Sequence, residues 1–298
     1  MLSYALITPA RDEADNLRRL GECVVAQRHP PSAWVVVDDG SVDETASVAR
    51  GFAARGHEWI HVIPSPGAEQ RSGPLASGRR AGRDVLAFNA GIAALDGTPD
   101  LLVKLDADVS FAPDYFERLA SRFASDPHLG IAGGLCTEQD GKGRWVPQHM
   151  TGDHVRGATR VYRVSCFQEV SPLPVRLGWD GIDELTAQVK GWRTTTFDDI
   201  RFRHHRPVGQ RDGSWSSWAS RGDTAHYMRY RPSYLVARSL YRSLRDVRAL
   251  AMIGGYAGAA LRREPRHSDD EVASHLRRQQ SLRRLPGAFR EAVGRRGA

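Results

Sequence analysis

The sequence predicts an α/β domain with a mostly parallel sheet flanked by helices, followed by a helical C-terminal extension. Short β-branched runs alternate with segments that carry apolar residues at helical spacing, and such alternation builds parallel sheets through right-handed crossovers. The 298 residues are enough for one large domain and a substantial appendage. Near residue 215 the composition changes to mixed aromatic residues and arginines, so we divide the chain into residues 1–215 and 216–298.

The first strands and helices are expected to follow one another closely. Residues 4–10 form a strand pattern, and the apolar residues in 17–24 recur at the spacing of an amphipathic helix. A β-branched run at 34–40 predicts a second, buried strand. Ser41 and Glu44 then form a capping-box pattern, which predicts that the second helix begins there.

The alternation continues after a long loop. Residues 64–84 are rich in Pro, Gly, Ser and Arg, and long loops of this kind in compact domains often serve as lids. A surface loop without a functional role is the alternative. Further strands and helices are expected at residues 61–63, 84–95, 101–108, 113–123 and 129–135.

The net charge indicates a surface with a positive bias. The formal charge is +7 and the sequence pI is about 9.6. Such a surface suits anionic partners, among them nucleotides, phospholipids and nucleic acids, although a solvated basic surface without a partner fits equally well. Because no nucleic-acid recognition motif accompanies the charge, we expect no nucleic-acid partner.

Cysteine content and hydropathy indicate the cellular compartment in which we expect the protein. The three cysteines lie far apart, predict neither a disulfide framework nor a zinc site, and fit a reducing compartment. The first residues lack the pattern of a signal peptide. The longest nearly apolar run, residues 249–261, is shorter than the roughly 20 residues of a transmembrane helix. We therefore expect a cytoplasmic protein that does not span a membrane.

Polar side chains follow three of the predicted strands. In open α/β sheets, ligands bind at the carboxyl ends of the strands, so three polar clusters on one edge predict a site. Each cluster alone would also suit a turn. The clusters are Thr8, Pro9, Arg11 and Glu13 after the first strand, Asp38 and Asp39 after the second, and Asp106 and Asp108 after the fourth.

The pair formed by Asp106 and Asp108 has the chemistry of a cation site. Residues two apart point to the same side of an extended chain, and two adjacent carboxylates repel unless a cation lies near them. A small number of oxygen ligands suits Mg²⁺ or Mn²⁺, which take the rest of their shell from water and phosphates. Such an ion can neutralise a diphosphate leaving group. A pair of exposed turn aspartates is the alternative.

Several nucleotide-binding classes are excluded by their motifs. No G-x-G-x-x-G follows the first strand, which argues against a dinucleotide site, and no G-x-x-x-x-G-K-[ST] is present. A phosphatase D-x-D pair normally opens its domain, whereas this one follows the fourth strand. A sugar nucleotidyltransferase would need a glycine-rich loop after the first strand, and TPARDEAD has no glycine.

Four segments follow in a specific order and spacing: ITPARDEADNL, WVVVDDGSVDET, VLAFNAGI and VKLDADVSFAPDYFERL. Together they resemble family 2 glycosyltransferases of the GT-A fold, over roughly residues 1–210. The resemblance implies a Rossmann-like sheet. It also implies transfer of a sugar from a nucleotide diphosphate sugar with inversion at the anomeric carbon.

The resemblance gives the first two strand ends a role in nucleotide binding. It implies that Thr8, Pro9 and Glu13 line the nucleotide pocket. It also implies that Asp38 accepts the imide hydrogen of the base, with Asp39 close by.

Further residues are expected at the diphosphate and the metal. By resemblance, Asp106 faces the ribose or the metal-bound waters and Asp108 binds the metal, while Arg83 and Asn89 face the diphosphate sugar. The chain departs from the family at Arg11, where an asparagine is frequent. Arg11 stays a candidate for nucleotide-sugar binding.

Inverting transfer also needs a general base that takes the acceptor's proton. Apolar residues in 185–192 recur at helical spacing and predict a helix that begins near Asp183. A carboxylate at a helix N-terminus is stabilised as the anion by about 0.3–1 kcal/mol. The family's acidic motif resembles GIDE here, so Asp183 is the predicted base, with Asp180 and Glu184 as alternatives. Alternatively, all three carboxylates only cap the helix and place negative charge at its start.

Two adjacent histidines, His204 and His205, follow a predicted strand. In the family, a histidine at this place can complete the metal shell or meet the diphosphate. The two side chains point to opposite sides of an extended chain, so one of them is expected to do so. A structural role for both is the alternative.

The C-terminal region mixes arginines with aromatic and apolar residues at 231–244 and 249–261. Basic amphipathic segments lie on anionic membranes, so we expect peripheral contact with the inner face of the cell membrane. Packing on the catalytic domain or on a second subunit, as in a homodimer, is the alternative.

The resulting hypothesis is a hexosyltransferase-like, nucleotide-sugar-dependent glycosyltransferase that uses a UDP-, GDP- or dTDP-sugar and Mg²⁺ or Mn²⁺. The expected acceptor is a carbohydrate or a lipid-linked molecule in polysaccharide or glycolipid biosynthesis. Two alternatives stay open: a GT-A protein that binds a nucleotide sugar without turnover, and a transferase for a soluble small-molecule acceptor.

Overall fold

The chain divides into two compact units, Met1–Pro207 and Val208–Ala298. The computed structural model describes residues 1–68, 81–148, 154–206, 214–244 and 246–280. The division expected at 215/216 falls in the first turn of helix α8 (Ser214–Tyr227), because the change in composition begins with that helix. Most of the expected lid loop, residues 69–80, lies outside the described residues.

The first unit is built on one sheet, with strand order β3-β2-β1-β4-β8-β6-β9-β5 and with β7 paired to β6. Strands β1 to β4 run parallel to one another. Strand β8 joins β4 to β6 by antiparallel pairing, and β9 returns parallel to β6. The strands are β1 Tyr4–Ala10, β2 Ala33–Asp38, β3 Ile60–Pro64, β4 Leu101–Leu105, β5 Val109–Phe111, β6 Leu129–Gln139, β7 Trp145–Pro147, β8 Thr159–Arg163 and β9 Arg193–His204.

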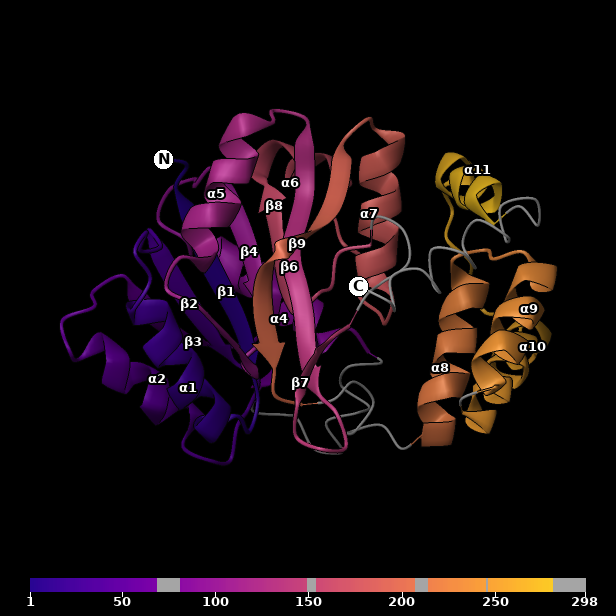
Figure 1. The fold of residues 1–298 in the computed structure, drawn as a ribbon, viewed down its shortest axis with the longest axis horizontal. Helices are drawn as coiled ribbons and strands as arrows, with labels where there is room; N and C mark the ends of the chain where they lie inside the picture. The colour runs from indigo at the N-terminus through magenta and orange to yellow at the C-terminus, as the bar shows by residue number, and fades with distance from the viewer. Residues whose placement is uncertain (69–80, 149–153, 207–213, 245, 281–298) are drawn as a thin grey trace. The chain divides into compact units, whose positions relative to one another are not determined.

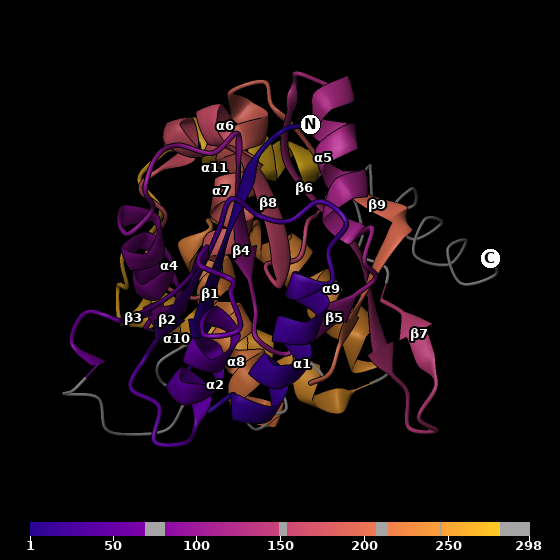
Figure 2. The same ribbon diagram turned by 90° about the vertical axis from the view of Figure 1, so that its left-hand side faces the viewer.

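Helices cover both faces of this sheet. Helices α1, α2 and α5 pack into one apolar core, and α4, α6 and α7 pack into a second core on the opposite face (Figure 1). In Figure 2, α4 and α6 lie on one side of β1 and β4, and α1 and α5 lie on the other. The α/β prediction is therefore confirmed. The helices are α1 Ala14–Val25, α2 Thr45–Ala53, α4 Arg83–Ala93, α5 Tyr115–Ser125, α6 Val164–Val170 and α7 Trp179–Val189.

The alternation of side chains along the strands explains the two cores. In β2, Trp34 and Val36 enter the core under α1, α2 and α5, whereas Val35 and Val37 enter the core under α4 and α7. All four are fully buried, as expected for a parallel strand covered on both faces. Apolar residues dominate both cores, whereas Asp38, Asp106 and Asp108 lie at or just past strand ends.

Helix α2 begins later than the capping-box pattern predicted. The Ser41 hydroxyl donates to Asp38 Oδ1 at 2.5 Å instead of capping a helix, and α2 starts at Thr45. Asp43 accepts hydrogen bonds from both the backbone and the hydroxyl of Thr45, which fixes this start. The DDGS segment is therefore a turn that belongs to the end of β2.

Helix α7 begins earlier than predicted, at Trp179 rather than near Asp183. The preceding residue, Gly178, has a φ of 90°, a conformation that favours glycine and turns the chain into the helix. Asp180 therefore stands in the first turn, and Asp183 lies one turn further in. The helix dipole acts mainly on the first turn, so the electrostatic argument made for Asp183 applies to Asp180.

The second unit is helical, as expected. Helices α8 and α10 approach closely because glycine, which has no Cβ, stands at their contact. A Cβ at Gly222 would lie 2.0 Å from the Met252 carbonyl oxygen, and one at Gly255 would lie 2.0 Å from the Ala219 carbonyl oxygen. A small core forms from Ala225, Leu235 and Met252. Within the described ranges, each helix is too short or too polar to cross a membrane. The other elements are α9 Pro232–Ser243, η2 Val247–Leu250, α10 Ala251–Leu261 and α11 Asp270–Gln279.

Candidate active site

The carboxyl ends of β1 and β2 form the first part of the candidate site. The Asp39 backbone N–H donates to the Ala10 carbonyl at 2.8 Å and ties the two strand ends together. Asp38 is half-buried and accepts the Ser41 backbone N–H at 3.0 Å, so its carboxylate is held in one orientation. Ser65, just after β3, is buried and its backbone N–H donates to the Asp38 carbonyl at 2.8 Å. Ser65 lies within residues 64–84, which the sequence pattern assigns to a loop, so it is not among the predicted site residues.

The residues predicted at the end of β1 differ in where their side chains go. Thr8 is fully buried, and its hydroxyl accepts a hydrogen bond from Trp34 Nε1 at 2.9 Å. The side chain of Thr8 therefore belongs to the core, and its expected place at the nucleotide pocket stays a prediction. Pro9 and Arg11 are half-buried at the strand end, with Arg11 3.9 Å from Asp12. Glu13 is 7% exposed and lies immediately before α1.

The pair Asp106 and Asp108 stands just past the end of β4, as the sequence indicated. Lys104 Nζ lies 2.6 Å from Asp106 Oδ1 and 3.8 Å from Asp84, which is on α4. Lys104 is buried, and its position two residues before Asp106 directs both side chains to the same side. One carboxylate of the pair is thus neutralised from within the sheet.

Asp108 receives two cationic neighbours from the end of β9. His204 Nε2 lies 3.3 Å from Asp108 Oδ1, and Arg206 Nη1 lies 3.3 Å from Asp108 Oδ2. One ligand atom each from Asp106, Asp108 and His204 lies within 4.8 Å of the others. Two carboxylates and one imidazole at this spacing fit a divalent cation, so the donor set suits the ion that the family resemblance implies.

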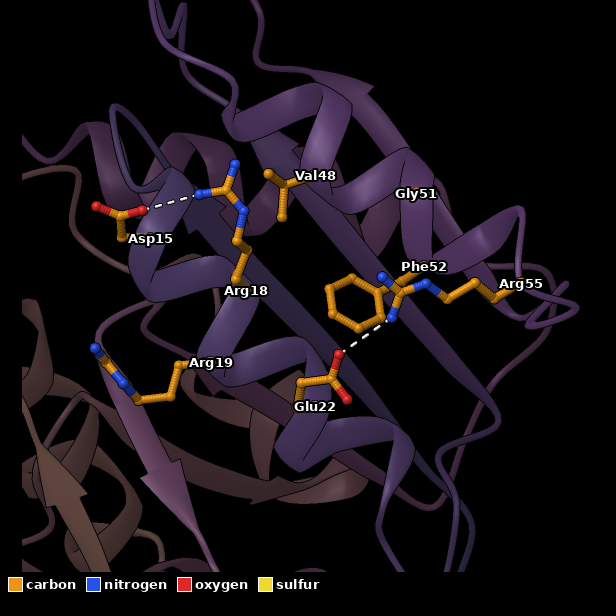
Figure 3. A pocket seen from close by; sticks show the side chains of 8 residues that line it. All are labelled: Asp15, Arg18, Arg19, Glu22, Val48, Gly51, Phe52 and Arg55. Atoms are coloured by element: carbon orange, nitrogen blue, oxygen red, sulfur yellow. Dashed lines mark hydrogen bonds and ion pairs between the residues drawn. The ribbon is translucent and has the colours of Figure 1, made fainter.

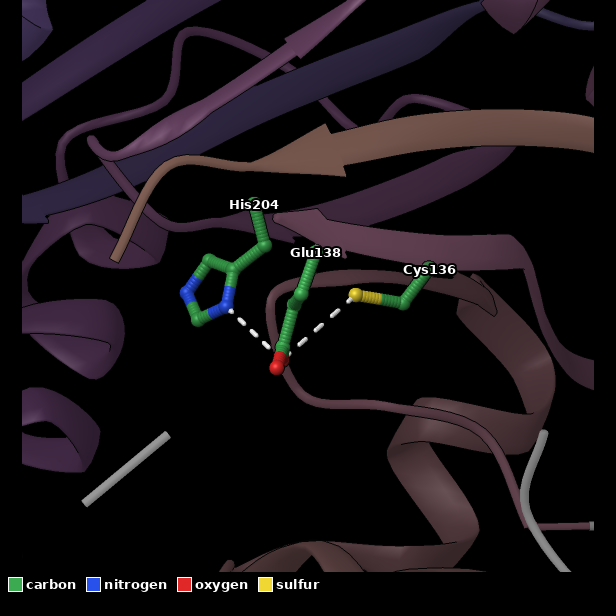
Figure 4. Close-up of side chains that lie close together, drawn as sticks. All are labelled: Cys136, Glu138 and His204. Atoms are coloured by element: carbon green, nitrogen blue, oxygen red, sulfur yellow. Dashed lines mark hydrogen bonds and ion pairs between the residues drawn. The ribbon is translucent and has the colours of Figure 1, made fainter. Parts of the chain in front are cut away.

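His204 also reaches a second set of polar groups on β6. Its Nδ1 lies 3.4 Å from Glu138 Oε1, and Cys136 Sγ lies 4.0 Å from the same oxygen (Figure 4). Arg156 Nη1 donates to Glu138 Oε1 at 2.7 Å. Burial alone would lower the pKa of His204, but its contacts with Asp108 and Glu138 outweigh burial and raise this pKa to about 9. The imidazole therefore carries a proton at neutral pH when it lies between two carboxylates.

His205 faces away from this cluster. Its Nε2 lies 2.8 Å from the Ser110 hydroxyl, and its ring meets Trp145 edge-on with centroids 5.2 Å apart. Burial, together with nearby Arg19, lowers its pKa to about 4, so the ring is neutral. Of the two histidines, His204 is the one that lies with the Asp106 and Asp108 pair.

The carboxylate of Asp183 is held inside the protein. It is 1% exposed, and Arg160 Nη2 donates to its Oδ1 at 2.8 Å while the Tyr162 hydroxyl donates to its Oδ2 at 2.5 Å. Burial raises the pKa of Asp183 to about 6, against the opposing effect of Arg160 and Tyr162. Glu184 accepts from the Val155 backbone and pairs with His154 at 2.8 Å.

Asp180 has a different environment from Asp183. It is half-buried, and the Cβ position at Gly157 would lie 3.6 Å from its Oδ2. Its neighbour Trp179 donates through Nε1 to Asp84 at 3.0 Å, and Lys104 lies 5.3 Å from the centre of the Trp179 ring. The start of α7 therefore adjoins the group that holds Asp106.

Two predicted residues lie on α4. Arg83 is the first residue of the helix, and its Nη1 is buried without a hydrogen-bond partner among the described residues. A buried guanidinium nitrogen of this kind is suited to an anionic ligand. Asn89 is exposed on the same helix, about one and two-thirds turns further along, so the two are not brought to one point.

A separate hollow of about 470 Å³ lies between α1 and α2 (Figure 3). Its charged side chains pair with one another: Arg18 lies 2.9 Å from Asp15, and Arg55 lies 3.1 Å from Glu22. None of its lining residues is a predicted site residue. The hollow is therefore distinct from the candidate active site.

Solved structures with the same fold are glycosyltransferases. The mannosyltransferase PcManGT from Pyrobaculum calidifontis, solved with GDP-Man and Mn²⁺, aligns with a TM-score of 0.56 and 16% identity over 97% of this chain and 80% of that chain. TarS 1–349 from S. aureus aligns with a TM-score of 0.54 and 17% identity over 75% and 64%. GalNAc-T7, solved with UDP, GalNAc and Mn²⁺, aligns with a TM-score of 0.54 and 13% identity over 76% and 48%.

At these identities the likeness concerns the fold, which is that of a GT-A glycosyltransferase. No curated protein matches the chain in sequence. Residues 5–174, more than half of the chain, match the family described as glycosyl transferase family 2, and the chain belongs to this family. The protein is thus a family 2 glycosyltransferase, as the sequence motifs predicted.

Proposed function

We propose that the protein transfers a sugar from a nucleotide diphosphate sugar to an acceptor hydroxyl with inversion, and that a divalent cation assists. The observation that carries this proposal is the grouping of Asp106, Asp108 and His204 at the carboxyl edge of the sheet. A second carboxylate cluster begins nearby, at the start of α7. An inverting transfer needs these two parts, a site for the leaving diphosphate and a base for the acceptor.

The donor would bind with its nucleotide against the ends of β1 and β2. Pro9, Arg11, Asp38 and Asp39 would face the nucleoside. Glu13 contacts Arg206, which also lies next to Asp108. Asp106, Asp108 and His204 would hold the divalent ion, and an ion bound there would neutralise charge on the leaving diphosphate. Because one ligand is an imidazole, we favour Mn²⁺ over Mg²⁺, which prefers oxygen ligands alone.

The base would be a carboxylate of α7, and two assignments are kept. Asp183 is the choice of the sequence motif, but it is 1% exposed and both of its oxygens already accept hydrogen bonds. Asp180 is favoured by its partial exposure and by its place in the first helical turn. A base has to lie within hydrogen-bond reach of the acceptor hydroxyl, which Asp180 can meet without rearrangement of the core. In the second assignment, Asp183 orients Arg160 and the helix start.

The acceptor would be a growing polysaccharide or a glycolipid precursor. The support is the second unit, where α9 exposes Val236, Leu240 and Leu244 at four-residue spacing among arginines. Such a surface suits peripheral contact with an anionic membrane, where lipid-linked acceptors reside. A soluble small-molecule acceptor, with the same surface serving a second subunit, is the alternative.

The donor proposal is tested by thermal unfolding of the full chain with UDP-, GDP- and dTDP-sugars, each with Mn²⁺, with Mg²⁺ and with EDTA. A ligand that binds the folded state raises the apparent stability by mass action. We expect one nucleotide class to raise the melting temperature, and only with metal. The same shift in EDTA would contradict metal-assisted binding, and no shift with any nucleotide sugar would contradict the donor class.

A further inference from the structure

Arg206 joins two residues of the candidate donor site that lie far apart in the sequence. It lies two residues after the end of β9, while Glu13 precedes α1 and Asp108 follows β4. Its Nη1 and Nη2 donate to the two carboxylate oxygens of Glu13 at 2.8 and 2.7 Å, and Nη1 also lies 3.3 Å from Asp108 Oδ2. One guanidinium thus connects the start of α1 with the cation site.

The two contacts of Arg206 differ in strength. The pairing with Glu13 is bidentate, with two short charge-assisted hydrogen bonds, and this geometry fixes the plane of the guanidinium. Asn16 Nδ2 donates to Glu13 Oε2 at 2.7 Å and helps to hold the carboxylate. The contact with Asp108 is longer and shares a nitrogen that Glu13 already uses. The Asp108 contact is therefore the one that can be exchanged.

A divalent cation at Asp108 would force this exchange. The carboxylate cannot hold the ion and keep Arg206 at full strength, because the two positive charges repel. A donor diphosphate bound to the same ion brings negative oxygens to the same edge of the sheet. In this exchange, Asp108 would bind the ion in place of Arg206, and Arg206 would bind a phosphate oxygen in place of Asp108. Every charge then stays paired.

The neighbouring cations are less suited to this role. Lys104 is 4% exposed at its side chain and is engaged by Asp106 and Asp84. His204 is 11% exposed and lies between Asp108 and Glu138. Arg206 is 24% exposed, so its guanidinium combines a fixed anchor with access from solvent.

We propose that Arg206, anchored by Glu13, is a donor-binding residue whose guanidinium pairs with the diphosphate of the nucleotide sugar once a divalent ion engages Asp108. This rests on the proposed transfer from a nucleotide diphosphate sugar and names a contact that the family motifs do not include. Arg206 would thus contact the leaving diphosphate. It would also compete with the metal ion for Asp108.

The test uses titration calorimetry on the full chain with two probes, Mn²⁺ alone and inorganic pyrophosphate in saturating Mn²⁺. Pyrophosphate makes the result independent of which base the donor carries. In Arg206→Gln, we expect Mn²⁺ alone to bind several-fold more tightly, since the competing charge is gone. Pyrophosphate should bind about tenfold or more weakly, because a charge-assisted contact is lost.

Arg201→Gln is the matched control. Arg201 lies on β9, the strand that Arg206 follows, and its side chain is exposed. Its Nε donates to the Asp198 carbonyl at 3.3 Å, so both affinities should equal those of the wild type. Circular dichroism and melting check the fold. Should Arg206→Gln not fold, Arg206→Lys replaces it: the charge remains, the two-pronged geometry is lost, and pyrophosphate should bind several-fold more weakly.

The two proposals fail in different ways. Wild-type affinity of a folded Arg206 variant for pyrophosphate would overturn the role of Arg206 and leave the donor class standing. Weakening of pyrophosphate by the Arg201 control to the same extent would also overturn it, because a general charge effect would then suffice. A wild-type chain that, with Mn²⁺, binds none of UDP, GDP, dTDP and pyrophosphate would overturn the proposed function and this inference together.

Discussion

Asp183 and Arg160 form an ion pair from which solvent is excluded, with Arg160 Nη2 2.8 Å from Asp183 Oδ1 and neither side chain exposed. The guanidinium also donates to the backbone carbonyls of Val155 and Asp180. Arg160 comes from β8 and Asp183 from α7, so the pair fastens the start of α7 to the sheet. A buried charge that loses its partner is costly, whereas an exposed carboxylate can be changed at little cost.

The first prediction separates the two candidates for the base. Asp183→Asn should lower the free energy of unfolding by about 3 kcal/mol or more, because it leaves Arg160 without its main counter-charge. Asp180→Asn should leave stability within about 0.5 kcal/mol of the wild type and abolish transfer while donor binding persists. Urea unfolding, donor affinity and transfer rate are measured for both variants.

The opposite pattern would assign the base to Asp183. Asp180→Asn would then retain transfer, and Asp183→Asn would lose it at temperatures where the variant is fully folded. With Asp183 as base, the rate should also fall as the pH drops below about 6, since its raised pKa leaves the carboxyl protonated there. Loss of donor binding in Asp180→Asn would instead show that Asp180 serves the donor.

The second prediction concerns Asp108→Ala, which should abolish metal-dependent donor binding and leave the fold intact. The fold survives because both cations that face Asp108 keep another carboxylate, His204 through Glu138 and Arg206 through Glu13. Asp96→Ala, at an exposed aspartate after α4, is the control. Melting curves with nucleotide sugar and Mn²⁺ make the comparison, and normal turnover by Asp108→Ala would refute the assigned metal site.

The third prediction is a pH dependence of stability in the metal-free protein. The pKa of His204 rises from 6.5 to about 9 on folding, through Asp108 and Glu138 and despite burial. Below pH 6.5 the folded and unfolded chains both carry the proton and the ion pairs contribute fully; above it the unfolded chain releases the proton first. The contribution is therefore lost as the pH rises from 6.5 through 9.

Urea unfolding in EDTA across this pH range measures the effect. His204→Gln, which keeps a polar side chain without the titrating proton, should remove most of the decline. An equal decline in wild type and variant would mean that other groups control it.

The location of the candidate site could be predicted because it depends on local patterns. An apolar run that ends in Asp106 and Asp108 places two carboxylates at a strand end in any parallel sheet, and the structure has them there. The same pattern indicates a partner for Asp106: Lys104 is a charge within an apolar run, two residues before Asp106, and has to face the same side.

The partners of these residues could not be predicted in the same way. Arg160 alternates with apolar residues in β8, which indicates a buried charge, yet only the packing of α7 on the sheet brings Asp183 to it. Arg206 and Glu13 are separated by nearly the whole first unit, so no periodicity relates them. Thr8 fits a motif at a strand end, but alternation turns its side chain to Trp34.

The fourth prediction concerns the second unit and membranes. Val236, Leu240 and Leu244 are 39%, 53% and 82% exposed and share one stripe of α9 and its end. A double substitution, Leu240→Glu with Leu244→Glu, should abolish co-flotation of the full chain with vesicles of phosphatidylcholine and phosphatidylglycerol, because burying two carboxylates in the interface is unfavourable.

Val42→Glu, at a 93% exposed position in the first unit, is the control and should float as the wild type does. Equal flotation of all three proteins would exclude this stripe as the contact, and a change in oligomeric state on gel filtration without a change in flotation would assign it to a second copy of the chain.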